Sequence, residues 1–244
     1  MNNRFIKTIT LLASSAIFIS GCDDTSSFET PNTNTDTTLN SGVISQKNFT
    51  ILSSDLTPSI FADPALDTFT FTELDITVRI GDRNNQVLTD AHTVYFKTEW
   101  GLIQPSCVTE NGTCSVTWQT SSGDTAPNDH KNTIMAYSIG EESFTDVNGD
   151  AIFDDNDNAT PSFSDIEEPF VDSNRNRMYD AGEPITDVVN GNDATGENGE
   201  HDFGDTFFNG NGCTHTSLCS ENFKTISVWD DVQINMDGPP AAVP

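Results

Sequence analysis

Hydrophobic and polar residues alternate with a period of two in several short stretches of the chain. In the clearest stretch, LDITVRI, residues Leu74, Ile76, Val78 and Ile80 alternate with polar residues before a Gly-Asp-Arg-Asn-Asn turn. This period places successive side chains on opposite faces, so it predicts a half-buried β-strand. Similar stretches predict further strands at residues 48–54, 93–99, 113–120, 132–139 and 224–234.

The spacing of these strands predicts the fold class. No window after the first 21 residues has a convincing helical period. Short strands joined by turns rich in Gly, Asn and Pro are typical of an antiparallel sandwich. The sequence therefore predicts an all-β antiparallel β-sandwich at residues 47–236, with Trp118 in its core and Trp229 at least partly buried. A flexible tail is expected at residues 237–244.

The N-terminus has the layout of a secretory signal peptide over residues 1–21. Arg4 and Lys7 precede an apolar stretch that is too short to cross a membrane. The sequence ISGC, which ends at Cys22, resembles the lipobox of bacterial lipoproteins, in which the cysteine is acylated and begins the mature chain. The resemblance implies a lipid anchor on Cys22, a membrane partner and a location in the bacterial cell envelope, on its periplasmic side or at the cell surface. A plain signal peptide cut nearby is the alternative.

Residues 22–46 are expected to form a tether. They consist mainly of Thr, Asn, Ser and Asp. Such a stretch buries too little apolar surface to offset the entropy of ordering it.

The first half of the sandwich resembles a known family. The run from Ile76 to Thr120, ITVRIGDRNNQVLTDAHTVYFKTEWGLIQPSCVTENGTCSVTWQT, resembles the bacterial Ig-like domains of the invasin and intimin type. The resemblance covers about residues 47–140 and resumes at 223–236. It implies an Ig-like β-sandwich that works as a stalk, spacer or binding module on cell-surface proteins, and it implies no chemistry.

The net charge excludes some partners. With 38 acidic residues against 10 Lys and Arg, the formal charge is −28. This balance repels nucleic acids and anionic lipid headgroups and attracts cations, so we expect no nucleic-acid partner. Half of the acids, 19 of 38, lie at residues 141–211, within an acidic insert at residues 141–222 before the last strand.

Two twelve-residue stretches of this insert, 146–157 and 172–183, share one pattern. Each has Asp or Asn at positions 1, 3, 5 and 9, an aromatic residue at 8 and an acid at 12. A loop that winds around Ca²⁺ uses such oxygens together with the main-chain carbonyl of position 7. Both stretches resemble the EF-hand-like loops of dockerins and thrombospondin type 3 repeats. The predicted ligands are Asp146, Asn148, Asp150, Ile152, Asp154 and Asp157 in the first loop and Asp172, Asn174, Asn176, Met178, Asp180 and Glu183 in the second.

Both loops depart from the pattern at position 6. Ala151 and Arg177 stand where glycine is expected, which weakens the prediction of a tight turn. A solvated acidic loop without an ion is the alternative to calcium, and Mg²⁺ is disfavoured because it rarely takes an all-protein oxygen shell. The two aromatic residues, Phe153 and Tyr179, are expected to pack against each other or on the sandwich. A further acidic stretch around residues 198–205 fits no template well.

The cysteines indicate an oxidising compartment. Besides Cys22 they form two close pairs, for which neighbour pairing is expected: Cys107 with Cys114, and Cys213 with Cys219. A zinc site built on Cys213, His215 and Cys219 is the alternative for the second pair.

We find no motif for catalysis. The chain lacks G-x-S-x-G and H-E-x-x-H, no carboxylate pair is singled out by an apolar setting, and the histidines are expected in exposed or turn positions. The sequence thus predicts a non-enzymatic, calcium-stabilised, lipid-anchored module for adhesion, protein interaction or spacing, with an envelope or cell-surface protein as its partner. Alternatives are a non-catalytic subunit of a larger envelope assembly, or a carbohydrate-active enzyme whose cleft would be lined by Trp100, Trp118 or Trp229.

Overall fold

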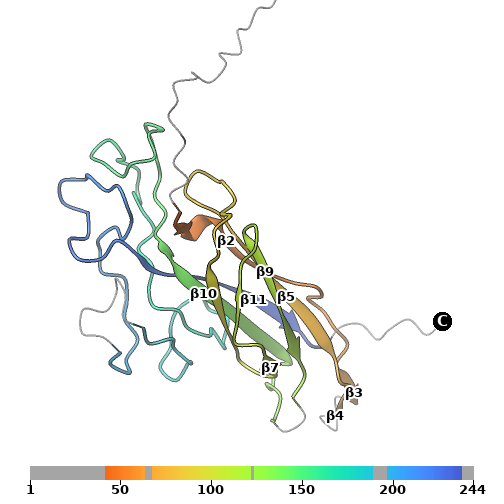
Figure 1. Cartoon of the computed structure of the whole chain (residues 1–244). Coiled ribbons are helices and arrows are strands. Elements are labelled where there is room, and N and C mark those ends of the chain that lie inside the picture. The colour runs from red at the N-terminus through yellow and green to blue at the C-terminus, as the bar shows by residue number, and fades with distance from the viewer. Residues whose placement is uncertain (1–41, 64–67, 122–123, 189–196, 238–244) are drawn as a thin grey trace, which may run out of the picture. The chain divides into compact units, whose positions relative to one another are not determined.

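The computed structural model describes residues 42–63, 68–121, 124–188 and 197–237 (Figure 1). The predicted signal peptide, Cys22 and most of the tether lie outside these ranges. Strands and one short 3-10 helix, η1 (Gln46–Asn48), make up the regular structure of the described residues. No helix in this part of the chain is long and apolar enough to cross a membrane.

Two main sheets form an all-β sandwich. The first sheet is antiparallel and contains, in spatial order, β2 (Phe49–Ser53), β5 (Glu73–Ile80), β9 (Thr113–Gln119) and β7 (Leu102–Ile103). The second sheet contains, in spatial order, β8 (Ser106–Val108), β6 (Thr93–Thr98), β10 (Lys131–Glu141) and β11 (Ile226–Asn235). The six strands that the period-two pattern predicts are all confirmed.

Short strands complete the fold. β1 (Ile44–Ser45) pairs in parallel with the last two residues of β10, and β3 (Phe61–Asp63) pairs with β4 (Thr68–Phe69) in a small separate sheet. Ile44 is fully buried, so the sandwich begins before residue 47 and the predicted tether of 22–46 is too long at its C-terminal end. A strand of two residues carries no periodic signal, which explains why the sequence does not predict it.

The core lies between the two main sheets. Leu74, Ile76, Val78 and Ile80 of β5 are all buried, as their alternation predicts. Trp118 on β9 is fully buried, and its indole N–H donates a hydrogen bond of 2.9 Å to the carbonyl of Trp100. Because burial leaves this donor only one partner, the bond fixes the ring within the core.

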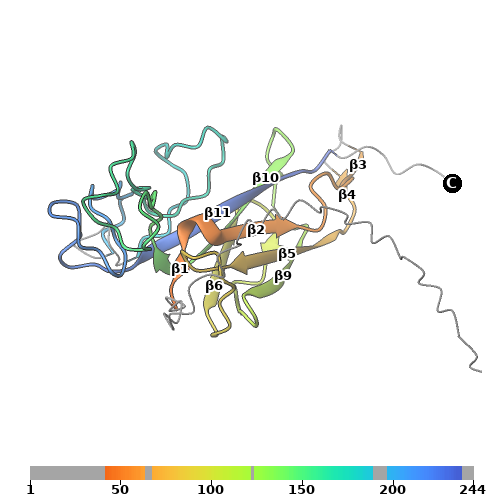
Figure 2. The same cartoon turned by 90° about the horizontal axis from the view of Figure 1, so that it is seen from above.

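Strand β10 is buried on both faces along part of its length. Ile134 and Ala136 belong to the core, but Thr133 and Met135, on the opposite face, are also fully buried. The acidic insert covers them. It runs from residue 142 to residue 225, between β10 and β11, and folds back onto the outer face of the second sheet (Figure 2).

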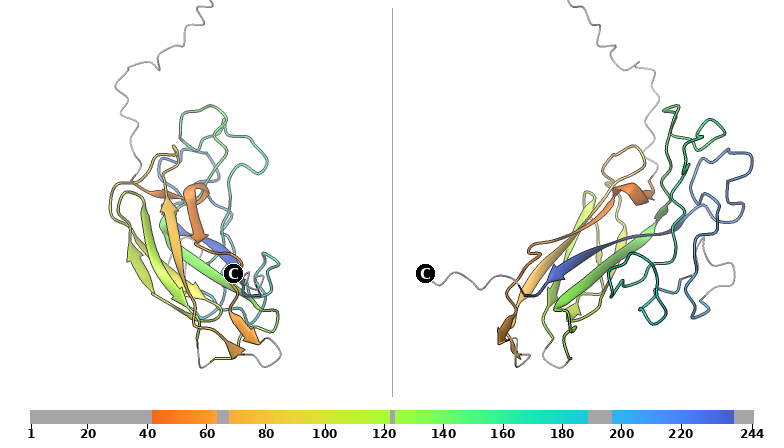
Figure 3. Two further views of the ribbon diagram at one scale, coloured as in Figure 1. Left: turned by 90° about the vertical axis from the view of Figure 1, so that its right-hand side faces the viewer. Right: turned by 180° about the vertical axis from the view of Figure 1, so that it is seen from behind.

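The insert contains no regular strand or helix within its described residues. Its loops begin beside the end of β10 and the start of β11, away from β3 and β4 (Figure 3), and the segment around Asp172 extends along the sheet to Thr133, near the start of β10. The main chain is held by turns, by isolated bridges and by carboxylates that accept hydrogen bonds from backbone amides. The carboxylates therefore organise this segment in place of a sheet.

Candidate metal-binding loops

In the first loop (residues 146–157), the carboxylates at both ends bind backbone amides of the loop itself. Asp146, at position 1, accepts hydrogen bonds from the N–H groups of Gly149 at 2.7 Å and Ala151 at 2.9 Å. Asp157, at position 12, accepts from Val147 at 2.8 Å and Asp154 at 3.1 Å. The carboxylate at position 1 therefore binds the amides of positions 4 and 6, and the carboxylate at position 12 binds the amides of positions 2 and 9.

The second loop (residues 172–183) repeats this arrangement position by position. Asp172 accepts hydrogen bonds from the amides of Arg175 at 2.5 Å and Arg177 at 2.8 Å. Glu183 accepts from Ser173 and from Asp180, both at 2.9 Å. Two unrelated solvated loops would not be expected to share these four contacts, so the common sequence pattern specifies a common local structure.

The middle of each loop also follows one rule. In both loops, the side-chain oxygen at position 3 accepts a hydrogen bond from the backbone N–H of position 5. The side-chain oxygen at position 5 likewise accepts one from the N–H of position 7. Such two-residue turns are the local hydrogen bonds that Asp and Asn favour. They point alternate polar side chains toward the inside of the loop.

The missing glycine at position 6 does not prevent the tight turn. Ala151 has a φ of 60° and Arg177 a φ of 63°, both in the left-handed region. This conformation costs a residue with a side chain about 1 to 2 kcal/mol. The two hydrogen bonds that each first-position carboxylate accepts lie directly across this turn and offset that cost.

Arg175 joins the second loop to the sandwich. Its guanidinium donates to the carboxylates of Asp129 at 2.6 Å and Glu99 at 2.8 Å, and its side chain is 9% exposed. Nearby, Thr133 on β10 donates its hydroxyl to the carbonyl of Asp172 at 2.8 Å, and Lys97 on β6 donates to the carbonyl of Ile185 at 2.7 Å. These polar contacts seat the second loop on the outer face of the second sheet.

Arg83 joins the first loop to the sandwich in a similar way. It lies in the turn after β5 and donates two hydrogen bonds to Glu141 at the end of β10. It also donates to the carbonyls of Ala151 at 3.0 Å and Asn211 at 2.6 Å. One arginine thus connects a turn of the sandwich to both ends of the acidic insert.

The position-8 aromatic residues pack in separate clusters. Phe153 is fully buried and contacts Phe208, with 4.8 Å between ring centroids. Tyr179 stacks on His201 at 4.0 Å and contacts Phe170 at 5.8 Å. The expectation that Phe153 and Tyr179 contact each other is therefore wrong. So is the expectation of an exposed His201, whose side chain is 1% exposed.

An internal repeat underlies these similarities, and the sequence analysis missed it. The stretch ESFTDVNGDAIFD, beginning at Glu142, matches EPFVDSNRNRMYD, beginning at Glu168, at an offset of 26 residues. In addition, the tetrapeptides SFTD, SFSD, PFVD and PITD end at Asp146, Asp165, Asp172 and Asp187. Their apolar residues pair in isolated bridges, Phe144 with Phe163 and Phe170 with Ile185.

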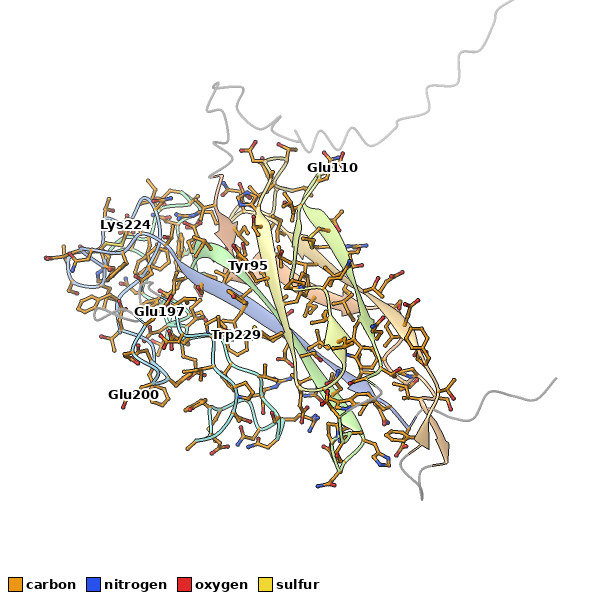
Figure 4. The ribbon with its side chains drawn as sticks, turned by 60° about the horizontal axis from the view of Figure 1, so that its bottom comes forward. Tyr95, Glu110, Glu197, Glu200, Lys224 and Trp229 are labelled. Atoms are coloured by element: carbon orange, nitrogen blue, oxygen red, sulfur yellow. A yellow bond between two sulfur atoms is a disulfide. The ribbon has the colours of Figure 1, made fainter. Side chains whose placement is uncertain are left out.

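The structure divides the acidic stretch around residues 198–205 between two places. Glu168 accepts the amides of Val188 and Asp202, each at 3.2 Å, and Asp187 accepts those of Asn198 at 3.2 Å and Gly199 at 2.5 Å. The side chain of Asp205 lies elsewhere, with Asp165 and Glu142. Glu200 is exposed at the edge of the insert (Figure 4).

The donor set of the loops is mixed. Among the described residues, no group of three or more His, Cys, Asp or Glu side chains is disposed to hold a metal ion by itself. A site in either loop therefore needs Asn oxygens and a main-chain carbonyl besides its carboxylates, which is the composition of a calcium loop.

The cysteines pair with their neighbours. Cys107 is bonded to Cys114, across β8 and β9, and Cys213 to Cys219, in the insert. With its two sulfurs in a disulfide, the alternative zinc site on Cys213, His215 and Cys219 has no thiolate ligand.

A groove of about 910 Å³ lies between β11 and the insert. Trp229, which is labelled in Figure 4, and Phe203 line it together with Glu167, Asp230 and Asp231. Burial raises the pKa of each of these three carboxyl groups. Trp100 is in the core with Trp118, so of the three tryptophans only Trp229 faces this groove.

No family model, curated protein or solved structure matches the chain.

Proposed function

We propose that this protein is a calcium-stabilised Ig-like module of the bacterial cell envelope, anchored through a lipid on Cys22. It works in adhesion or as a protein-interaction or spacer domain. The observation that carries the proposal is the repeated hydrogen-bond frame of the first and second loops.

Calcium is the ion that suits this frame. The loops offer only hard oxygen donors, at the alternating positions from which Ca²⁺ takes six to eight ligands. The insert is strongly acidic, so a divalent cation removes much of its self-repulsion. Extracellular calcium modules have dissociation constants of roughly 10⁻⁴ to 10⁻³ M, a range in which free calcium outside the cytosol controls occupancy.

The strand order supports the Ig-like assignment. Sheet β2-β5-β9-β7 corresponds to the A-B-E-D sheet of an Ig-like sandwich, and strands β6, β10 and β11 correspond to C-F-G. The chain departs from that pattern in two respects. β7 precedes β8, and the disulfide between the two sheets, Cys107–Cys114, joins β8 to β9 instead of the B and F strands. The acidic insert then occupies the F–G connection, a loop that often contacts partners in this fold.

A sugar-binding role is the second candidate, because one observation favours it. The groove beside β11 combines the aromatic faces of Trp229 and Phe203 with the carboxylates of Asp230 and Asp231. Binding of a soluble glycan that is lost in Trp229→Ala and retained in a Trp100→Phe control would support this role over protein contacts alone.

Thermal unfolding of the purified chain with calcium and with a chelator tests the calcium proposal. At ten times the dissociation constant, each site adds about 1.4 kcal/mol of stability. Two sites then raise the midpoint by roughly 5 to 11 °C, at about 2 to 4 °C per kcal/mol for a protein of this size.

Matched variants sharpen this test. Asp172→Asn replaces the first carboxylate of the second loop with an uncharged amide and is expected to reduce the shift by about half. Asp75→Asn, an exposed acid on β5, leaves the shift unchanged. An equal midpoint with calcium and with chelator in the wild type, and equal protease sensitivity of residues 142–225, would refute calcium binding.

The lipid anchor has its own test. Labelled palmitate should enter the wild-type chain expressed in bacteria and should not enter Cys22→Ala. Labelling of both or of neither contradicts the lipoprotein assignment without affecting the calcium sites.

A further inference from the structure

Glu142 has the contacts of a position-12 carboxylate, although no twelve-residue loop precedes it. It directly follows β10 and is 1% exposed. Its Oε1 accepts the amide of Ile166 at 2.9 Å, and its Oε2 accepts the amide of Asn209 at 2.8 Å. In the first and second loops, the closing acid accepts the amides of positions 2 and 9. By this correspondence Asp165 takes position 1 and Asn209 takes position 9.

The remaining contacts agree with that assignment. Asp165 accepts the amide of Thr206 at 3.1 Å, as position 1 accepts the amide of position 6. Thr206 has a φ of 67°, the left-handed conformation of position 6 in both continuous loops. Asp205 accepts the amide of Phe207 at 2.7 Å, as position 5 accepts that of position 7. Three separate segments thus reproduce the frame of one continuous loop.

The aromatic residue falls at the expected place as well. Phe208, at position 8, is fully buried and contacts Phe153, which is position 8 of the first loop. The first loop and this discontinuous loop therefore share an aromatic core. The frame defines where an ion would lie, but hydrogen bonds within a cluster of acids do not by themselves indicate a ligand.

Asn209 supplies an independent indication. Its side chain is fully buried, and its Oδ1 is a buried oxygen without a hydrogen-bond partner among the described residues. Its Nδ2 donates to Asp205 Oδ1 at 3.1 Å, so the amide group is held against the position-5 carboxylate. A buried carbonyl oxygen left without a partner costs about 1 to 3 kcal/mol. A cation bound beside this amide group is the partner that its oxygen lacks.

The charge of the cluster points the same way. Glu142 is 1% exposed, and the carboxylates of Asp165 and Asp205 lie close to it. A buried carboxylate with like charges around it is stabilised by a bound cation. In the equivalent arrangement around Glu168, the buried atoms without a hydrogen-bond partner among the described residues are Thr186 Oγ1 and His201 Nδ1. Thr186 directly precedes the first position and His201 stands at position 8, so neither occupies a ligand position and we assign no ion there.

We propose that Glu142, Asp165, Asp205 and Asn209 bind a further calcium ion, in addition to those of the first and second loops. The inference rests on the proposed function only in taking the same ion. This ion joins the start of the insert to its last third, so it closes the insert around the aromatic core of Phe153 and Phe208.

Counting bound calcium by equilibrium dialysis tests the proposal. Asp165→Asn and Asn209→Leu are each expected to bind one ion fewer than the wild type. Asn209→Asp keeps an oxygen ligand and is expected to bind the wild-type number. The double variant Asp146→Asn, Asp172→Asn is expected to lose calcium binding in the two continuous loops and to keep the further ion.

The outcomes separate the two proposals. A wild type that binds no calcium overturns both. A wild type that binds two ions, both lost in the Asp146→Asn, Asp172→Asn variant, overturns only the further site. Equal ion counts in the wild type, Asp165→Asn and Asn209→Leu also overturn it. Circular dichroism establishes that each variant is folded, and Asp165→Asn provides the test if Asn209→Leu does not fold.

Discussion

The buried ion pair between Arg83 and Glu141 should be among the most sensitive points of the molecule. The side chain of Arg83 is 9% exposed and that of Glu141 is fully buried. Replacing Arg83 with Met keeps an apolar chain of similar length but removes both hydrogen bonds to the carboxylate. Glu141 then keeps only the amide of Asn211, at 3.2 Å, among the bonds described here.

The expected loss follows from this geometry. Removing one partner of a buried ion pair costs about 3 to 5 kcal/mol, because the other charge stays buried without compensation. The substitution also removes the hydrogen bonds from Arg83 to the carbonyls of Ala151 and Asn211, so the upper part of that range applies. At about 2 to 4 °C per kcal/mol, the melting midpoint should fall by roughly 8 to 20 °C.

Calorimetry with matched variants checks this prediction. Arg79→Met, on the exposed face of β5, should change stability by less than about 0.5 kcal/mol. The double variant Arg83→Met, Glu141→Met should recover much of the loss, because it removes the buried charge as well. If Arg83→Met and Arg79→Met melt at the same temperature, the ion pair does not hold the insert on the sandwich.

Two further predictions concern the sandwich itself. Gly101→Ala should lower the free energy of unfolding, measured in urea, by roughly 2 to 5 kcal/mol. Gly101 has a φ of +86°, and an added Cβ would lie 2.6 Å from the indole nitrogen of Trp118. The control Gly42→Ala, at a φ of +66° with no atom within 4 Å of the added Cβ, should lower it by only about 1 kcal/mol. Burial lowers the pKa of His92 below its ordinary 6.5, against the opposing effect of Asp90. The contribution of His92 to stability should therefore be complete above pH 6.5 and should be lost as the pH falls below it. His92→Gln should flatten that decline, and an unchanged slope would contradict the assignment.

Much of the sandwich can be predicted from the sequence, because its longer strands show the alternation of hydrophobic and polar residues. β5 alternates through all eight of its residues, and β9 and β11 also bury an alternating set for part of their length. β1 and β7 are two residues long, which leaves no period to detect. Tertiary contacts decide such strands: a Cβ at Gly140 would lie 2.4 Å from the carbonyl of Ile44, so glycine permits the pairing of β1.

The continuous loops can be predicted from the sequence for a different reason. Their carboxylate and amide side chains bind backbone amides two to ten residues away, so the whole frame lies within twelve residues. The discontinuous loop spreads the same frame from Glu142 to Asn209. A search for local spacing cannot find it. The repeated tetrapeptides ending in Asp165 and Asp187 do mark first positions, and they are the signal that an internal-repeat search would have used.

The contacts between loops indicate how calcium would act on the molecule. Phe153 and Phe208 are the position-8 residues of two different loops and pack in one buried core. Ordering one loop therefore also orders the aromatic residue against which the other loop packs. Arg83 binds the carbonyl of Ala151, at position 6 of the first loop, and the carboxylate at the end of β10. An ion that fixes the first loop therefore also fixes the register of the insert on the sheet. By this argument the proposed calcium ions would set the position of the whole protrusion relative to the sandwich.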